Sequence, residues 1–176
     1  FYNGNLISNM HENLNINSKF TKYSEILDLN KAEVVVKHNY TFYPSRSSFE
    51  AELISDLIKG YFDNNIALNR FSIISPFRTQ VKQIKNSLER HFNDNQIKEI
   101  FVDTIERMQG KENDIVIISY AVSDPEKDKL RLSYLFNLQR FNVAITRSKM
   151  KRIFIASKRV FDVNYENPNV NKLTSV

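Results

Sequence analysis

The chain has 176 residues, of which 41% are hydrophobic and 26% charged, and it carries a net charge of +5. This length suits one domain with a real core, and no apolar run approaches the ~20 residues of a membrane span. Because cysteine is absent, disulfides and thiolate metal sites are excluded, and a reducing, cytoplasmic setting is expected. The three histidines lack metal-ligand spacing, so no metal site is predicted. The basic balance permits nucleic-acid or nucleotide partners.

Glycine occurs only at Gly4, Gly60 and Gly110. A phosphate-binding loop GxxxxGK[ST] and a dinucleotide-binding GxGxxG both need closely spaced glycines, so that backbone amides can surround phosphate. Neither can be built here, and another segment must therefore hold the phosphates of any bound nucleotide. Because the chain begins at Phe1 rather than Met, we interpret it as a fragment of a longer protein.

The hydrophobic pattern predicts strands that alternate with helices. Ser47 and Glu50 have the spacing of a capping box, which predicts a helix to about Phe62. A second helix is indicated by apolar residues at helical spacing from Val81 to Phe92. Strands are predicted at residues 33–37, 71–75, 99–103, 115–121 and 152–156. We divide the chain into a lead-in (1–33), one domain (34–163) and a tail (164–176).

The alternation favours an open parallel sheet with right-handed crossovers. The continuous apolar run 115–121 indicates a strand covered on both faces, as parallel sheets require. Ligands of such sheets lie beyond the carboxyl ends of the strands. We therefore expect Ser75, Pro76, Thr104 and the segment 137–150 near those ends.

Segment 137–150 reads as a helix with two faces. One face is an apolar stripe, and the other places Ala144 between Arg140 and Arg147. A small residue between two guanidinium groups suits a phosphate. Taken alone, the segment is better explained as a surface helix with ordinary arginines.

Three segments, in order, resemble conserved motifs of superfamily 1 helicases. ISPFRTQ (74–80) resembles motif IV, TIERMQGKE (104–112) resembles motif V, and QRFNVAITRSK (139–149) resembles motif VI. The residues within motif VI are similar to those of the branch that contains the nonsense-mediated-decay RNA helicase and the DNA-replication helicase/nucleases. The resemblance covers about residues 45–160. For motif IV, a strand–turn–helix junction without a ligand explains the residues as well.

The resemblance implies a RecA-like second motor domain: an α/β fold with a parallel sheet flanked by helices, of the P-loop NTPase type but without its own phosphate loop. It also implies ATP and Mg²⁺ as cofactors, with Mg²⁺ held mainly by a preceding motor domain. Arg147 would be the catalytic arginine finger. The ATP side would be formed by Gln109, Gly110, Glu112, Arg140 and Gln80. The nucleic-acid side would be formed by Thr104, Ser75 and Pro76.

By this resemblance, the chain is predicted to be the C-terminal motor domain of an ATP-dependent helicase that acts on single-stranded DNA or RNA. Its partner would be the N-terminal motor domain of the same polypeptide, and the fragment alone is predicted to be inactive. The alternative is a non-catalytic nucleic-acid-binding or scaffold module that retains the fold. A kinase-like nucleotide enzyme is disfavoured because the phosphate loop is absent.

Overall fold

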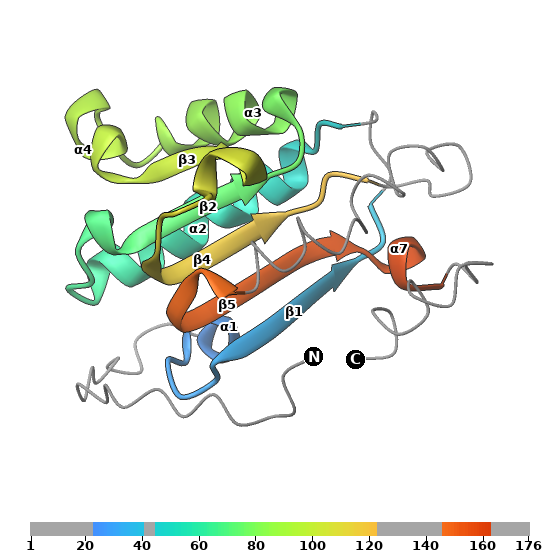
Figure 1. Ribbon diagram of the computed structural model, residues 1–176, viewed down its shortest axis with the longest axis horizontal. Coiled ribbons are helices and arrows are strands. Elements are labelled where there is room, and N and C mark those ends of the chain that lie inside the picture. The colour runs from blue at the N-terminus through green and yellow to red at the C-terminus, as the bar shows by residue number, and fades with distance from the viewer. Residues whose placement is uncertain (1–22, 41–44, 123–145, 163–176) are drawn as a thin grey trace.

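The computed structural model describes residues 23–40, 45–122 and 146–162, which form a five-stranded sheet flanked by helices (Figure 1). The strand order is β1-β5-β4-β2-β3, and every neighbouring pair is parallel. This arrangement confirms the predicted α/β class with a parallel sheet. The strands are β1 (Glu33–His38), β2 (Phe71–Ser75), β3 (Phe101–Thr104), β4 (Asn113–Ser119) and β5 (Ser148–Ser157).

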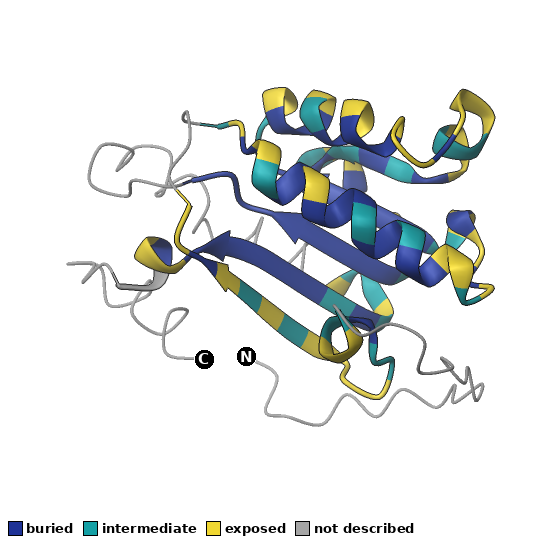
Figure 2. Ribbon diagram, turned by 180° about the vertical axis from the view of Figure 1, so that it is seen from behind, coloured by how far each residue is buried: buried dark blue, intermediate teal, exposed yellow. Residues whose placement is uncertain are grey.

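Helices cover one face of the sheet, and a short turn of helix covers part of the other (Figures 1 and 2). The α-helices are α1 (Ser24–Leu27), α2 (Ser48–Asp63), α3 (Arg78–Leu88), α4 (Asp94–Glu99) and α7 (Lys158–Asp162). The 3-10 helices are η1 (Leu68–Arg70) and η2 (Ile105–Met108). None of these described helices is both long and apolar enough to cross a membrane.

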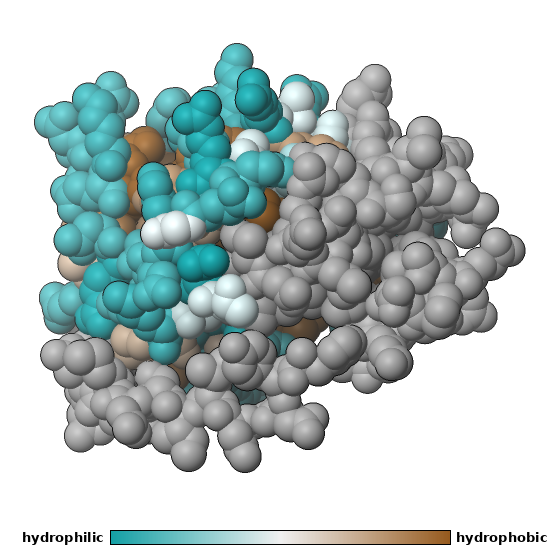
Figure 3. All heavy atoms as spheres, viewed as in Figure 1, coloured by the Kyte–Doolittle hydropathy of each residue, from teal (hydrophilic) through white to brown (hydrophobic). Residues whose placement is uncertain are grey.

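The central strands are buried on both faces, as the apolar run in β4 predicted. Ile115 and Ile117 pack into the core beneath α2 and α3, whereas Val116 and Ile118 pack beneath η2 on the opposite face. Successive side chains of a strand point to opposite faces, so a strand covered on both must be apolar throughout. On the face seen in Figure 3, the described side chains are mostly hydrophilic, and hydrophobic groups show only between them.

Several predicted elements differ from the structure at their ends. The strand predicted at 115–121 ends at Ser119, and Ala121 holds a φ of +48°. Residues 148–150, expected at the end of a helix, are the first residues of β5, where Ser148 pairs with Asn113. Long-range pairing with β4 therefore overrides the helical periodicity of this segment. Glu99, expected in a strand, ends α4, whose capping box joins Asn93 and Gln96. Residues 137–145, including Arg140, lie outside the described part of the chain.

The cap of α2 is only half as predicted. Ser47 Oγ accepts a hydrogen bond from the Glu50 backbone N–H, as a capping box requires. In a capping box the Ser47 N–H would donate to the Glu50 side chain. Here it donates instead to Gln80 Oε1 on α3, at 2.7 Å. The Glu50 side chain is thereby left to bind other groups.

The segment before β1 packs against the same core. Leu27 of α1 is 1% exposed, and the Tyr61 hydroxyl of α2 donates to the Ile26 carbonyl. Lys151 on β5 is buried, and its Nζ donates to the carbonyls of Asp28 and Lys31. How the chain divides into domains stays a prediction.

Candidate functional site

The amino ends of β4 and β5 bring two of the predicted motifs together. Asn113 pairs with Ser148, and the Asn113 N–H donates to the Arg147 carbonyl at 3.0 Å. Glu112 and Arg147 therefore precede paired positions on neighbouring strands. Residues 109–112 are exposed at this edge.

Gly110 allows the chain to turn into β4. Its φ of +76° lies in the left-handed region, where a side chain is strained, although a Cβ there would meet nothing within 4 Å. The glycine is therefore needed for backbone conformation, and the space beside it is open.

Arg147 lies in the turn before β5 and is half-buried. Its Nε is buried and has no hydrogen-bond partner in the described structure. A buried N–H without an acceptor is costly, and an oxyanion such as phosphate would satisfy it. This observation fits the group that the resemblance implies at Arg147.

The neighbouring arginine at this edge is already paired. Arg70 Nε donates to Asp114 Oδ2 at 2.5 Å, and its terminal nitrogen contacts Met150 Sδ at 3.4 Å. Arg147 forms no such ion pair with the described residues. Arg147 rather than Arg70 is therefore the guanidinium available to a ligand here.

The carboxyl ends of β2 and β3 gather the residues predicted to contact nucleic acid. Ser75 pairs with Thr104 across these strands. Ser75 and Pro76 are buried and Thr104 is 8% exposed. Ser75 Oγ accepts from the Phe77 N–H at 3.3 Å, which shapes the turn into α3. The described side chains of this group are therefore used mainly within the fold.

Arg147 and residues 109–112 lie at the amino ends of β5 and β4, which corrects the expectation that the segment 137–150 would lie near the carboxyl ends. Ser75, Pro76 and Thr104 lie at the carboxyl ends of β2 and β3, and Gln80 of the predicted ATP group lies on that side too, in the first turn of α3. Residues 105–112 start at the carboxyl end of β3 and must return along the sheet, because β3 and β4 both run parallel to β2.

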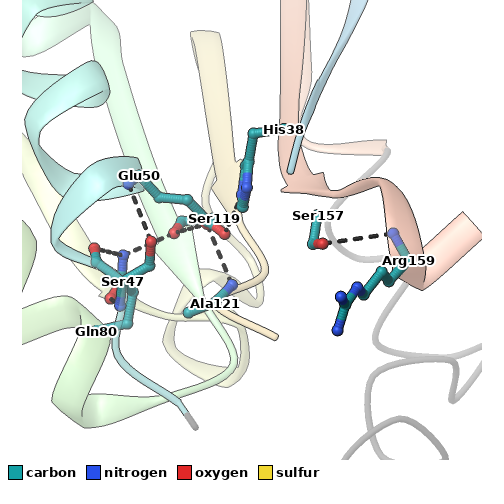
Figure 4. A network of polar contacts seen from close by, with 8 residues as sticks. All are labelled: His38, Ser47, Glu50, Gln80, Ser119, Ala121, Ser157 and Arg159. Atoms are coloured by element: carbon teal, nitrogen blue, oxygen red, sulfur yellow. Dashed lines mark hydrogen bonds and ion pairs between the residues drawn. The ribbon is translucent and has the colours of Figure 1, made fainter. Parts of the chain in front are cut away.

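A buried polar network joins the carboxyl ends of β1 and β4 to the amino ends of α2 and α3 (Figure 4). Glu50 is fully buried, and its Oε1 lies 3.0 Å from His38 Nε2. Its Oε2 accepts from Ser119 Oγ at 2.6 Å and from the Ala121 N–H at 3.1 Å. Ala121, which makes the backbone bond, holds a φ of +48° in the left-handed region.

Gln80, predicted on the ATP side, belongs to this network. Its Nε2 donates to the Ser47 carbonyl at 3.1 Å and to Ser119 Oγ at 3.0 Å, and the side chain is fully buried. With Oε1 bound to the Ser47 N–H, its polar atoms all have partners within the fold. A contact between Gln80 and nucleotide stays a prediction.

A set of basic residues follows the carboxyl ends of strands; sequence reasoning weighed Arg78 only as an alternative to Gln80 on the ATP side and missed the others. They are exposed and form no ion pair with other described residues: Arg46 after β1, Arg78 after β2, and Lys158 and Arg159 after β5. In Figure 4, Arg159 belongs to α7, and its backbone N–H donates to Ser157 Oγ at the end of β5. For Arg78, Lys158 and Arg159, the signal in the sequence was a position within three residues of the end of a predicted strand.

No group of three or more metal-ligating side chains occurs in the part of the chain that is described.

These features define an α/β domain with an all-parallel sheet, in which residues 109–112 and Arg147 lie at the amino ends of β4 and β5. A family model described as an AAA domain (AAA_12) matches residues 1–159. The chain belongs to this AAA-domain family, the C-terminal part of superfamily 1 helicases of the group that includes sen1 and DNA2.

Individual relatives match over shorter stretches. Helicase sen1 of Schizosaccharomyces pombe is 24% identical over 81% of this chain and 8% of its own length. An uncharacterised ATP-dependent helicase of Methanocaldococcus jannaschii is 32% identical over 63% of this chain and 15% of its own. The DNA replication ATP-dependent helicase/nuclease DNA2 of Xenopus laevis is 33% identical over 60% and 10%. The chain thus spans a small part of each relative.

Among solved structures, the C-terminal domain of a possible DNA helicase from Lactobacillus plantarum WCFS1 is similar. It is 14% identical, with a TM-score of 0.46, over 82% of this chain and 90% of that one.

Proposed function

We propose that this chain is the second motor domain of an ATP-dependent superfamily 1 helicase, and that it completes an ATP site shared with a preceding motor domain. The observation that carries the proposal is the pairing of Asn113 with Ser148. This register supports the proposal, because Glu112 and Arg147 precede the paired residues and Gly110 lies two residues before Glu112. The ATP-dependent helicases among the relatives support the same activity.

In this proposal, Arg147 binds the terminal phosphate of ATP across the interdomain cleft. Its buried Nε has no acceptor among the described residues, and a phosphate oxygen would supply one. Charge that develops on the transferred phosphoryl group is stabilised by such a guanidinium, which raises the rate by about 10³–10⁵-fold in related systems. The phosphate loop and the Mg²⁺ ligands belong to the preceding domain.

Three of the other residues proposed to contact ATP lie at the same end of the sheet as Arg147. Gln109, Gly110 and Glu112 are exposed at the same edge and can reach the nucleotide base, sugar or nearby water. Arg140 lies outside the described residues, and its contact with phosphate is carried over from the resemblance. Gln80 is proposed to act indirectly, because its amide holds Ser47 and Ser119.

The opposite end of the sheet is the proposed track for single-stranded DNA or RNA. Ser75, Pro76 and Thr104 shape the two turns there, while Arg78 and Arg159 are exposed without an ion pair among the described residues. Basic side chains bind phosphates of any base sequence, so binding is expected to weaken steeply with salt. Closure and opening of the ATP cleft would move this end relative to the preceding domain.

The test is ATP hydrolysis by the full-length parent and its Arg147→Ala variant, with and without single-stranded DNA or RNA. We expect nucleic acid to stimulate turnover, and the variant to lose about 10³-fold or more of kcat with a much smaller change in ATP affinity. Lys149→Ala is the matched control, because Lys149 is an exposed cation two residues further along and should leave kcat unchanged.

Two results would count against the proposal. Equal losses of turnover and ATP affinity would make Arg147 a simple binding residue. No hydrolysis by the parent under any condition would favour a non-catalytic nucleic-acid-binding module.

A further inference from the structure

We propose that Tyr40 is a stacking platform for a nucleobase of single-stranded nucleic acid at the carboxyl-end side of the sheet. The inference rests on the proposed nucleic-acid track and adds a subsite to it. None of the three motifs includes Tyr40, which follows β1 at the edge of the sheet.

The Tyr40 ring is supported on one side and open on the other. It stacks on Phe49 of α2, with ring centroids 4.1 Å apart and planes 25° from parallel. Phe49 is half-buried and packs against the core, while Tyr40 is 57% exposed. A stacked pair of this kind holds the outer ring in place, because its inner face is fixed by a packed neighbour.

Basic residues occur in the chain segments next to this stacked pair. His38, the last residue of β1, pairs with Ser157, the last residue of β5, and Tyr40 follows His38 by two residues while Lys158 and Arg159 begin α7 directly after Ser157. Phe49, on which Tyr40 stacks, lies in the first turn of α2, three residues after Arg46. An exposed ring next to segments that carry basic side chains suits both parts of a single strand, the flat base and the charged phosphate.

Phe62 is an exposed aromatic ring that lacks a stacked neighbour among the described residues. It is 39% exposed at the far end of α2 and meets Phe92 edge-to-face, with centroids 5.7 Å apart. The nearby cation Lys59 is paired with Asp63. Phe62 therefore serves as the matched control for Tyr40.

The first experiment measures binding of the 176-residue chain to labelled oligothymidine of about 15 nucleotides and to an abasic strand with the same phosphates. We expect Tyr40→Ala to weaken binding to oligothymidine by about 5- to 100-fold and to leave the abasic strand unchanged. Phe62→Ala should change neither affinity, and Arg159→Ala should weaken both. Thermal unfolding of each variant checks that the fold is kept.

The second experiment uses the absence of tryptophan from the chain. Tyr40→Trp introduces a single fluorophore, and its emission should be quenched by oligothymidine or oligouridine but not by the abasic strand. Phe62→Trp should not respond.

The two proposals fail in different ways. If the wild-type chain binds neither strand at low salt, the nucleic-acid track itself is wrong, and this subsite with it. If it binds both strands, but Tyr40→Ala binds oligothymidine as well as the wild type does, only the stacking inference is overturned. Loss of binding to both strands in Tyr40→Ala would also overturn it, because that pattern indicates a general effect on the surface.

Discussion

At the residue scale, the buried carboxylate of Glu50 on α2 binds groups from β1, from β4 and from the segment after β4. Its carboxylate has no exposure and receives hydrogen bonds from the Ser119 hydroxyl and the Ala121 amide, with His38 on its other oxygen. Each donor would be left buried without an acceptor if the carboxylate were removed. Removing one partner from a buried hydrogen-bond network lowers the free energy of unfolding far more than removing one partner of an exposed ion pair.

We therefore expect Glu50→Ala to lower the free energy of unfolding by about 3–5 kcal/mol. Glu52 is the control, because it lies two residues along the same helix in an exposed pair with Arg90. Glu52→Ala should cost no more than about 1 kcal/mol. Urea unfolding followed by circular dichroism measures both, and equal costs would show that the Glu50 network adds little stability.

Lys151 acts at the scale of elements, because it connects β5 to the segment after α1. Its Nζ donates to two carbonyls, those of Asp28 and Lys31, at 2.6 Å each. Burial lowers the pKa of Lys151 from 10.5 to about 8, against a smaller opposing effect of the nearby Asp28 charge. The folded state therefore releases this proton at a lower pH than the unfolded chain does.

The sign of the pH effect follows from this difference. Between pH 8 and 10 the unfolded chain holds more protons at Lys151, so the free energy of unfolding should rise with pH, by roughly 1–3 kcal/mol. Above that window the trend should reverse, since burial raises the pKa of Tyr61 and Tyr120 above their ordinary value.

Lys151→Met should abolish the rise, whereas Lys149→Met, at an exposed position, should keep it. Urea unfolding at a series of pH values measures the slope. A wild-type slope that persists in Lys151→Met would assign the effect to another group.

At the scale of the whole molecule, Arg147 and the exposed cations proposed to bind nucleic acid lie at opposite ends of the sheet. Arg147 and residues 109–112 lie at the amino ends of β5 and β4, while the exposed cations Arg78 and Arg159 follow the carboxyl ends of β2 and β5. A rigid parallel sheet between them would transmit a domain rotation from one end to the other. In the proposed helicase, this is how a change at ATP would become movement along a nucleic acid.

We expect the isolated 176-residue chain to release no phosphate from ATP above the rate in buffer. It contains only three glycines and no phosphate loop, so it supplies one side of the proposed site. A phosphate-release assay with Mg²⁺ and single-stranded DNA measures this. Turnover by the chain that disappears in Arg147→Ala would overturn the split-site proposal.

The sequence by itself determined the fold class, because continuous apolar runs such as that of β4 can be satisfied only by a sheet covered on both faces. It also determined the start of α2, because the Ser47 cap is a local contact between residues three apart. Local periodicity and capping depend on neighbours in the chain, and a single sequence displays them directly.

Only the tertiary structure decided which predicted residues share a site. The pairing of Asn113 with Ser148 turned residues 148–150 into a strand and placed Arg147 at the amino edge, away from Thr104. Gln80 likewise completes the cap of α2 from another helix. These contacts join residues more than thirty positions apart, and their geometry depends on strand register and packing that no local pattern encodes.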